Sequence, residues 1–165
     1  MAKYFETFPK LLYDIDNSKN FKLVTDIFRR IKVREQLKEN AALFSKYSVP
    51  SGEQPETTSY KHFGTTDYFW IILLLNDITD RYYGWPLSDA DFEKYVNDKY
   101  TNPGGVHHYE ITQSSGPTTG NGPDDLSHKI EVNETEAGAE SVSNFEFERR
   151  LQDKKRQIKL LDPRY

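Results

Sequence analysis

The sequence predicts an α+β fold, and three patterns lead to this expectation. A strand-like run followed by two short helical runs occupies residues 44–76. Two alternating runs, at 106–112 and 126–132, predict an antiparallel β-hairpin, because successive side chains of a strand face opposite sides. A capping residue at Ser88, Asp89 or Asp91, and another at Ser143, predict two further helices. The chain is therefore expected to consist of four segments: 1–43, 44–100, 101–142 and 143–165.

Segment 1–43 is expected to be an extended arm followed by a helix. Residues 1–20 combine aromatic side chains with Pro9 and a turn-rich run, which is typical of an arm held by apolar anchors. Apolar residues at helical spacing favour a helix from Phe21 to roughly Asn40. Alternation from Arg30 to Val33 leaves a strand as the alternative for part of it. The arm either packs on its own domain or crosses onto a neighbouring chain.

The rest of the chain is organised around residues 44–76. A strand is predicted from Phe44 to Val49, followed by a turn at Pro50–Gly52. Pro55 suits the first position of a helix, where its missing N–H has no cost, and Gly64 suits the position just after the helix.

A second helix is predicted from Tyr68 to Leu75, capped by Thr66 or Asp67. Its eight residues leave it no polar face. A helix that is apolar all round must be covered on every side, so other parts of the chain, or another protein, are expected to cover it.

The remaining elements complete the α+β pattern. Segment 101–142 is expected to hold the hairpin, with a flexible tip at Ser114–Asp125 and a loose polar stretch from Asn133 to Val142. In segment 143–165, Ser143 and Glu146 form a capping box that begins a helix to about Lys155. A docking strand is expected from Gln157 to Leu161.

Composition restricts the class of protein. The chain of 165 residues has a net charge of −4 and no cysteine, so it predicts neither a nucleic-acid partner nor a disulfide framework. The longest apolar run, 68–75, falls well short of the roughly 20 residues that span a membrane, and the N-terminus is not expected to be a signal peptide. Residues 19–38 hold seven basic side chains and residues 124–140 six acidic ones. These are either solvated faces or complementary contact surfaces within an assembly.

The central stretch resembles a LysM module. The resemblance lies in Tyr47-x-Val49, Gly52-Glu53, the helix end at Tyr60–Gly64, and Trp70 six residues before Asn76. LysM modules are small βααβ units, many of which bind N-acetylglucosamine polymers. Their second strand follows the Asn, whereas residues 80–87 here do not look like that strand.

A longer series of motifs resembles one family more closely. Val24–Arg29, His62–Gly64, Tyr82–Trp85 and Arg156–Lys159 lie in an order similar to that in the LysM-like baseplate wedge subunit of T4-like contractile-tail phages, the product of gene fifty-three. Residues 113–143 match poorly and are treated as variable. The resemblance implies an α+β fold with a LysM-like βαα(β) core, extended N- and C-terminal arms and a β-hairpin.

The resemblance also implies a structural function: linking wedge subunits and adjacent wedges during baseplate assembly. The expected partners are other wedge proteins and neighbouring wedges, with no nucleic acid, membrane, small-molecule substrate, cofactor or metal. The expected location is the tail baseplate of the virion, and the host cytoplasm during assembly. The side chains expected to contact partners are Phe5, Phe8, Phe28, Tyr82, Tyr83, Phe147, Leu151, Ile158 and Leu160. Trp85 is expected to fold back over the second helix.

The alternative function is that of a LysM-type module binding peptidoglycan or a related glycan. The groove expected from the resemblance lies between two turns, and its residues are Ser51, Gly52, Glu53, Asn76, Asp77 and Ile78. A metal site at His108, Glu110 and His128 requires a hairpin register that joins them, and no metal is expected there. No nucleophile elbow, P-loop or dinucleotide motif occurs in the sequence, and no enzymatic activity is expected.

Overall fold

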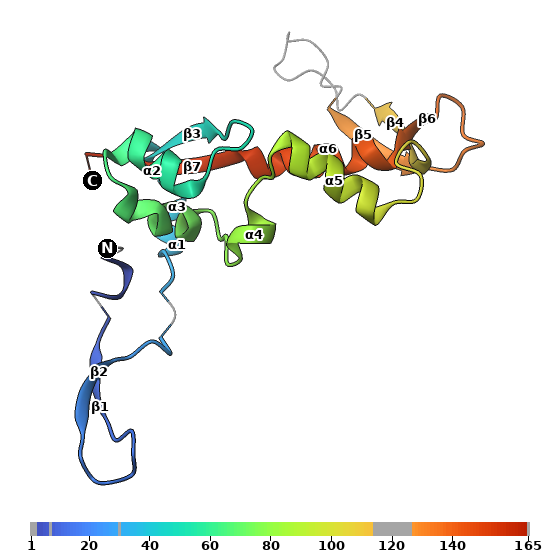
Figure 1. Cartoon of the computed structure of the whole chain (residues 1–165). Helices are drawn as coiled ribbons and strands as arrows, with labels where there is room; N and C mark the ends of the chain where they lie inside the picture. The colour runs from blue at the N-terminus through green and yellow to red at the C-terminus, as the bar shows by residue number, and fades with distance from the viewer. Residues whose placement is uncertain (1–2, 7, 30, 114–126, 165) are drawn as a thin grey trace. The chain divides into compact units, whose positions relative to one another are not determined.

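The computed structural model describes residues 3–6, 8–29, 31–113 and 127–164 (Figure 1). This part of the chain is α+β, with small antiparallel sheets and several short helices. It divides into two compact units: unit 1, residues 1–86 and 155–165, and unit 2, residues 87–154. The four segments expected from the sequence cut across these units, because the helix at 89–99 lies in unit 2 and the strand at 157–161 in unit 1.

The N-terminal part of unit 1 is a β-hairpin, and the helix predicted from Phe21 to Asn40 is wrong. After the 3-10 turn η1 (Lys3–Phe5), strand β1 (Lys10–Tyr13) pairs with β2 (Lys22–Thr25) in antiparallel register. Only one helical turn, α1 (Glu35–Lys38), forms in the predicted range. The strand alternative for 30–33 is also wrong for residues 31–33, which lie in no element.

Local turn chemistry explains why the hairpin forms here. The Asp14 carboxylate accepts hydrogen bonds from the backbone N–H groups of Ser18 and Lys19, at 3.2 and 2.7 Å. Asn17 and Lys19 adopt positive φ angles of 55° and 64°, which reverse the chain. This turn brings two apolar runs side by side, so they pair as strands. The spacing of the apolar residues alone would fit a helix, but the pairing with a second strand decides the conformation.

The centre of unit 1 follows the predicted order. The turn η2 (Ala41–Leu43) leads into β3 (Phe44–Ser48), α2 (Pro55–Phe63), η3 (Thr66–Tyr68) and α3 (Phe69–Leu75). The strand at 44–49 and the helix ending before Gly64 are confirmed, and Gly64 has the left-handed φ of 73° that favours glycine. The cap of η3 is Thr65, whose side chain accepts from Asp67 N, and not Thr66 or Asp67.

The strand that pairs with β3 comes from the other end of the chain. β7 (Gln157–Leu161) lies antiparallel to β3, with Tyr47 opposite Ile158. Residues 80–87 form the short helix α4 (Arg81–Gly84) in place of a strand. The predicted docking strand 157–161 is therefore present, and it docks on this chain's own β3.

Trp85 returns from α4 into the core of unit 1. This core consists of Val49, Ile72, Trp85, Ile158 and Leu160. The prediction that Trp85 folds back over the second helix is confirmed, since its indole is buried and packs with Ile72 of α3. The closer likeness to a LysM module stays a prediction.

Helix α3 is covered largely from within the chain. Ile72 is fully buried at 0% exposure, and none of the side chains from Phe69 to Leu75 is exposed. On one side the Tyr4 ring of η1 packs against Trp70, with ring centroids 5.2 Å apart. The first turn of the arm therefore packs on its own unit, which is one of the two alternatives that the sequence left open.

Unit 2 is a three-stranded sheet with two helices. Helix α5 (Asp89–Lys99) precedes β4 (Val106–Gln113), β5 (His128–Val132), β6 (Glu140–Ser143) and α6 (Asn144–Arg156). β4 is the central strand of the order β5-β4-β6. The predicted hairpin is confirmed, and so is the cap at Ser143, whose Oγ accepts from Glu146 N. Of the three candidates for the cap of α5, the structure selects Ser88, whose Oγ accepts from Asp91 N.

One strand of unit 2, β6, was not predicted from the sequence. β6 lies within the stretch 133–142 that was expected to be loose, and it pairs with the free edge of β4. The predicted tip 114–125 lies outside the described residues. Among the described residues, no helix is both long and apolar enough to cross a membrane.

Candidate interaction surfaces

The first turn of the predicted glycan groove is held by a buried carboxylate. Glu53 accepts hydrogen bonds from the Tyr47 hydroxyl at 2.9 Å, the Thr58 hydroxyl at 2.7 Å and the Lys61 ammonium. Burial raises the pKa of Glu53, but the hydrogen bonds from Lys61, Thr58 and Tyr47 outweigh it and hold that pKa below its usual value. Glu53 therefore stabilises its own turn, while its neighbours Ser51 and Gly52 are exposed.

The second turn of that groove fastens β7 to α3. Asn76 Nδ2 donates to the carbonyls of Ile72 and Lys159, at 2.8 and 2.9 Å, and Asn76 Oδ1 accepts from Lys159 N. Asp77 binds the Lys38 ammonium at 2.7 Å, and Ile78 packs against the core.

The segment after the second turn contacts the first one. Trp85 Nε1 donates to the backbone carbonyl of Glu53 at 2.7 Å. Of the six predicted groove residues, Glu53, Asn76 and Ile78 thus contribute to holding unit 1 together, and Ser51, Gly52 and Asp77 remain exposed.

The residues expected to contact partners fall into three groups: exposed, half-buried and buried. Phe5, Phe28, Tyr82, Tyr83 and Leu151 are exposed, and Phe28 is the most exposed at 93%. Phe147 is half-buried, because it stacks on His107. Phe8, Ile158 and Leu160 are buried within this chain, and their contact with a partner stays a prediction.

The physical reason for this burial is different for the two residues of β7 and for Phe8. Ile158 and Leu160 are alternate residues of β7, so both face the core, at 3% and 1% exposure. Phe8 packs against the rings of Tyr4 and Phe5.

The hairpin β1–β2 exposes much more apolar surface than the sequence analysis expected. Leu12 and Leu23 are register partners on one face, and both are about two-thirds exposed. A two-stranded hairpin by itself is marginally stable in water, so a hairpin without core cover is typical of a segment that is buried in a complex. The exposed apolar residues that we call the arm surface are Leu12, Tyr13, Ile15, Phe21, Leu23, Ile27 and Phe28.

Helix α4 displays two tyrosines on a rigid support. Asp80 caps the helix by accepting from the N–H groups of Tyr82 and Tyr83, and both rings are about 80% exposed. A Cβ on Gly84 would lie 2.7 Å from Ile78 Cγ2, so only glycine allows this close approach. Trp85 anchors the end of α4 that is opposite to the Asp80 cap. The two tyrosine rings therefore point into solvent, and tyrosine is one of the residue types that dominate binding energy at interfaces.

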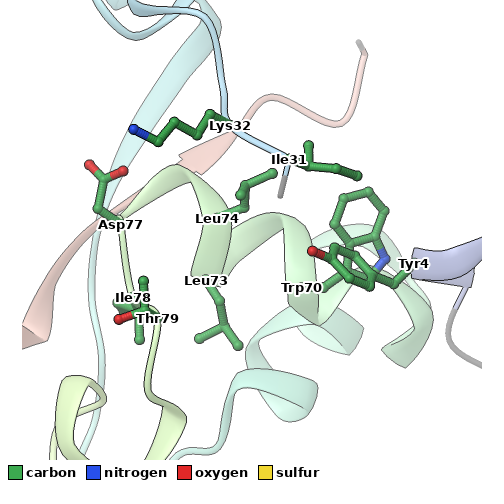
Figure 2. Close-up of a pocket in the computed structure, with 9 residues that line it drawn as sticks. All are labelled: Tyr4, Ile31, Lys32, Trp70, Leu73, Leu74, Asp77, Ile78 and Thr79. Atoms are coloured by element: carbon green, nitrogen blue, oxygen red, sulfur yellow. The ribbon is translucent and has the colours of Figure 1, made fainter. Parts of the chain in front are cut away.

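A pocket of 580 Å³ lies beside α3 in unit 1. Figure 2 shows Trp70, Leu73 and Leu74 projecting from α3 toward it. Trp70 Nε1 is buried and has no hydrogen-bond partner among the described residues. No sequence pattern predicted this pocket, because part of its wall comes from Tyr4, Ile31 and Lys32, which are distant from α3 in the chain. Its remaining lining residues, Asp77, Ile78 and Thr79, follow α3 directly.

Unit 2 contains a buried carboxylate that is paired with two basic groups. Glu110 accepts from Arg150 Nη1 at 2.7 Å and from the Lys129 ammonium. The hydrogen bond from Arg150 is the largest cause that lowers the pKa of Glu110, to about 2, against the opposing effect of burial. The β4–β5 register sets His128 opposite Gln113, three residues from Glu110, so the histidine–glutamate set does not meet. The described residues hold no group of three metal-ligating side chains.

The depressed pKa of Glu110 predicts that unit 2 loses stability in acid. A carboxyl with a lower pKa in the folded state contributes stability above its unfolded pKa, near 4.5, and loses it as the pH falls toward 2. Replacing Glu110 with Gln is expected to cost about 1–3 kcal/mol at pH 7 and much less at pH 3. Hydrogen exchange of the β4 amides in the full chain measures this difference.

The matched control for this experiment is Glu93→Gln, on the exposed side of α5. It is expected to leave β4 exchange unchanged at both pH values. Equal costs for Glu110→Gln at pH 7 and pH 3 would show that the ion pairs do not carry the stability.

Comparisons with known proteins point to one family. Residues 4–116 match the family model described as base plate wedge protein 53. The chain is 30% identical over 82 residues to the baseplate wedge protein gp53 of Enterobacteria phage T4. That match covers 50% of this chain and 42% of the T4 protein's length. Residues 4–116 include the arm surface and the exposed tyrosines of α4.

Proposed function

Because this chain belongs to the base plate wedge protein 53 family, we propose that it links wedge subunits to one another and to adjacent wedges during baseplate assembly. Membership makes it a structural protein of the virion, located in the tail baseplate, and confirms the family resemblance seen in the sequence. The proposal adds the linking role, the wedge proteins as partners, assembly in the host cytoplasm, and the lack of an enzymatic function.

The arm surface carries this proposal. Five of its seven apolar side chains belong to the hairpin β1–β2, and Ile27 and Phe28 follow β2 directly; the core of unit 1 contains none of the seven. Burying such side chains on a partner is worth about 25 cal/mol for each Å² of apolar surface removed from water. The hairpin thus has the composition of an element that becomes stable when it is covered by another protein.

The tyrosines of α4 form a second contact surface. Tyr82 and Tyr83 lose little conformational freedom on binding, because their backbone is already fixed by the Asp80 cap and by Trp85. Preorganised aromatic side chains are favoured as interface anchors for this reason. A linking protein needs at least two surfaces, and the arm surface and α4 supply them.

The double change Tyr82→Ser and Tyr83→Ser tests this function. Retention of the chain in wedges isolated from infected cells is expected to fall tenfold or more, as loss of interface anchors worth 2 kcal/mol or more implies. The change Leu23→Ser with Phe28→Ser is expected to act similarly. Thermal unfolding of the isolated chain should stay within about 0.5 kcal/mol of the wild type for the tyrosine pair, because both rings are solvent-exposed.

The matched control is Tyr60→Ser, since Tyr60 is also exposed but lies on α2 and belongs to neither surface. It should leave retention unchanged. If both double variants join wedges as well as the control does, neither surface is a contact and the proposed linking role fails.

Glycan binding, the alternative from the sequence, stays a prediction. The side chains of Glu53 and Asn76 form their hydrogen bonds with other groups of unit 1. No contact among the described residues therefore favours glycan binding. Sedimentation with insoluble peptidoglycan distinguishes the two functions: a wedge linker remains in the supernatant, and a glycan-binding module sediments with the polymer.

A further inference from the structure

The charge of this chain is divided unequally between its two units. Unit 1 contains 16 Lys and Arg against 12 Asp and Glu, a net charge of +4, and unit 2 contains 6 against 14, a net charge of −8. The two values add up to the −4 of the whole chain. Opposite net charges favour contact between a unit 1 surface of one copy of the chain and a unit 2 surface of another copy.

The acidic excess of unit 2 is concentrated at one end of its sheet. Four exposed glutamates, which we call the acidic face, lie on β5, on the connection to β6 and at the start of β6; they are Glu131, Glu134, Glu136 and Glu140. No Lys or Arg occurs between Lys129 and Arg149. Lys129 and Arg150 form ion pairs with Glu110, so their positive charges are already paired with a carboxylate outside the acidic face.

The basic excess of unit 1 is concentrated next to the arm surface. Lys22, Lys32 and Arg34 are exposed, and Phe21, Leu23, Ile27 and Phe28 are exposed among them. Residues 19–38 have a net charge of +5, from seven basic and two acidic side chains. We call residues 21–34 the basic arm; its Arg30 lies outside the described residues.

We propose that the basic arm of one copy docks on the acidic face of a second copy of this chain. The inference rests on the proposed function, in which neighbouring wedges bring copies next to one another. Opposite charges set the partner and its orientation, while the apolar side chains of the arm supply the buried area. Because the two surfaces lie on different units, the contact is head-to-tail, which is the kind of contact that builds closed rings.

The backbone of both surfaces fits this contact. β5 and β6 are the outer strands of the unit 2 sheet, and β1 and β2 each have one edge that pairs with no strand among the described residues. Edge strands present unpaired N–H and C=O groups that a further strand can satisfy. A hairpin added at such an edge gives main-chain hydrogen bonds in addition to the charge contacts.

Charge reversal tests the contact in the full chain. The arm variant is Lys22→Glu with Lys32→Glu, and the face variant is Glu134→Lys with Glu136→Lys. Sedimentation velocity at low salt is expected to show reversible self-association of the wild type that weakens as salt is added. Each variant alone should associate at least tenfold more weakly, and an equimolar mixture of the two should recover most of the association.

The matched control is Lys46→Glu with Lys159→Glu. It changes the net charge of the chain by the same amount as the arm variant does, but at exposed positions of the β3–β7 sheet. It should associate as the wild type does. Circular dichroism of every variant establishes that it is folded, and recovery in the mixture excludes misfolding as the cause of the loss.

Three results overturn the inference: a wild type that stays monomeric at every concentration, a single variant that associates normally, or a mixture that recovers nothing. A monomeric wild type whose sedimentation coefficient changes with salt would assign the contact to one chain's own two units. If the inference fails while the Tyr82 and Tyr83 variant still loses its place in wedges, the proposed function stands. If that variant and the Leu23→Ser, Phe28→Ser variant are both also retained normally, the inference and the proposed function both fail.

Discussion

Removal of residues 157–165 is expected to unfold the centre of unit 1. β7 pairs along its whole length with β3, and it buries Ile158 and Leu160 in the core. Loss of two buried aliphatic side chains costs about 2–5 kcal/mol each, which approaches the whole stability of about 5–15 kcal/mol typical of a domain. Asn76 would also lose its hydrogen bonds to Lys159.

Tryptophan fluorescence measures this effect most directly. In a Trp70→Phe background, Trp85 is the one remaining indole, and its emission should shift to that of a solvated indole when β7 is removed. Deleting only residues 162–165 should leave the emission unchanged, because these residues follow the strand. Addition of a peptide with residues 155–165 should restore the buried emission, since it supplies the missing strand.

An unshifted Trp85 emission after removal of β7 would contradict this expectation. It would mean that β3, α2 and α3 hold their core without the second strand. The C-terminal strand would then be free to act as the external docking element that the sequence analysis expected.

Replacement of Trp85 with Ala is expected to destabilise the chain by about 3–5 kcal/mol, as is usual for a buried Trp. The indole packs against Ile72 and Ile158 and donates to the Glu53 carbonyl. Truncation therefore leaves a cavity and an unpaired buried acceptor at once. Urea unfolding of the full chain at pH 7, followed by circular dichroism, measures the loss.

Two further variants show where this energy comes from. Trp85→Phe keeps part of the packing but removes the donor, so its cost should lie between those of the wild type and the Ala variant. Tyr82→Ala, three residues away and exposed, should cost less than about 0.5 kcal/mol. A cost below 1 kcal/mol for Trp85→Ala would show that the segment after α3 is not part of the core.

The correct expectations depend on interactions between residues close in the sequence. Pro55 and Gly64 bound α2, and Ser88 caps α5, because a cap or a stop needs only bonds within one helical turn. The predicted helix at 21–40 is wrong because its conformation depends on pairing with a second segment. Its apolar spacing fits a helix, but the turn held by Asp14 brings β1 onto β2, and the sequence pattern does not show that pairing.

The exposed contact surfaces were only partly predictable. Phe28, Tyr82 and Tyr83 were expected at an interface and are exposed, although their role stays a prediction. Leu12 and Leu23 were missed, because an apolar residue in a predicted arm or helix is ordinarily assigned to a core. Ile158 and Leu160 were assigned to partners because the sequence did not indicate which strand they face.

The sequence by itself determined the α+β class, the family, the bounds of α2, the cap of α6 and the distribution of charge. Each of these depends on residue type or on neighbours a few positions apart. The tertiary structure decided that β7 closes the sheet of β3, that Trp85 fills the core and that the arm is a hairpin without cover. These features depend on pairing between distant segments, whose free energy comes from burial and from backbone hydrogen bonds that exist only once the chain has folded.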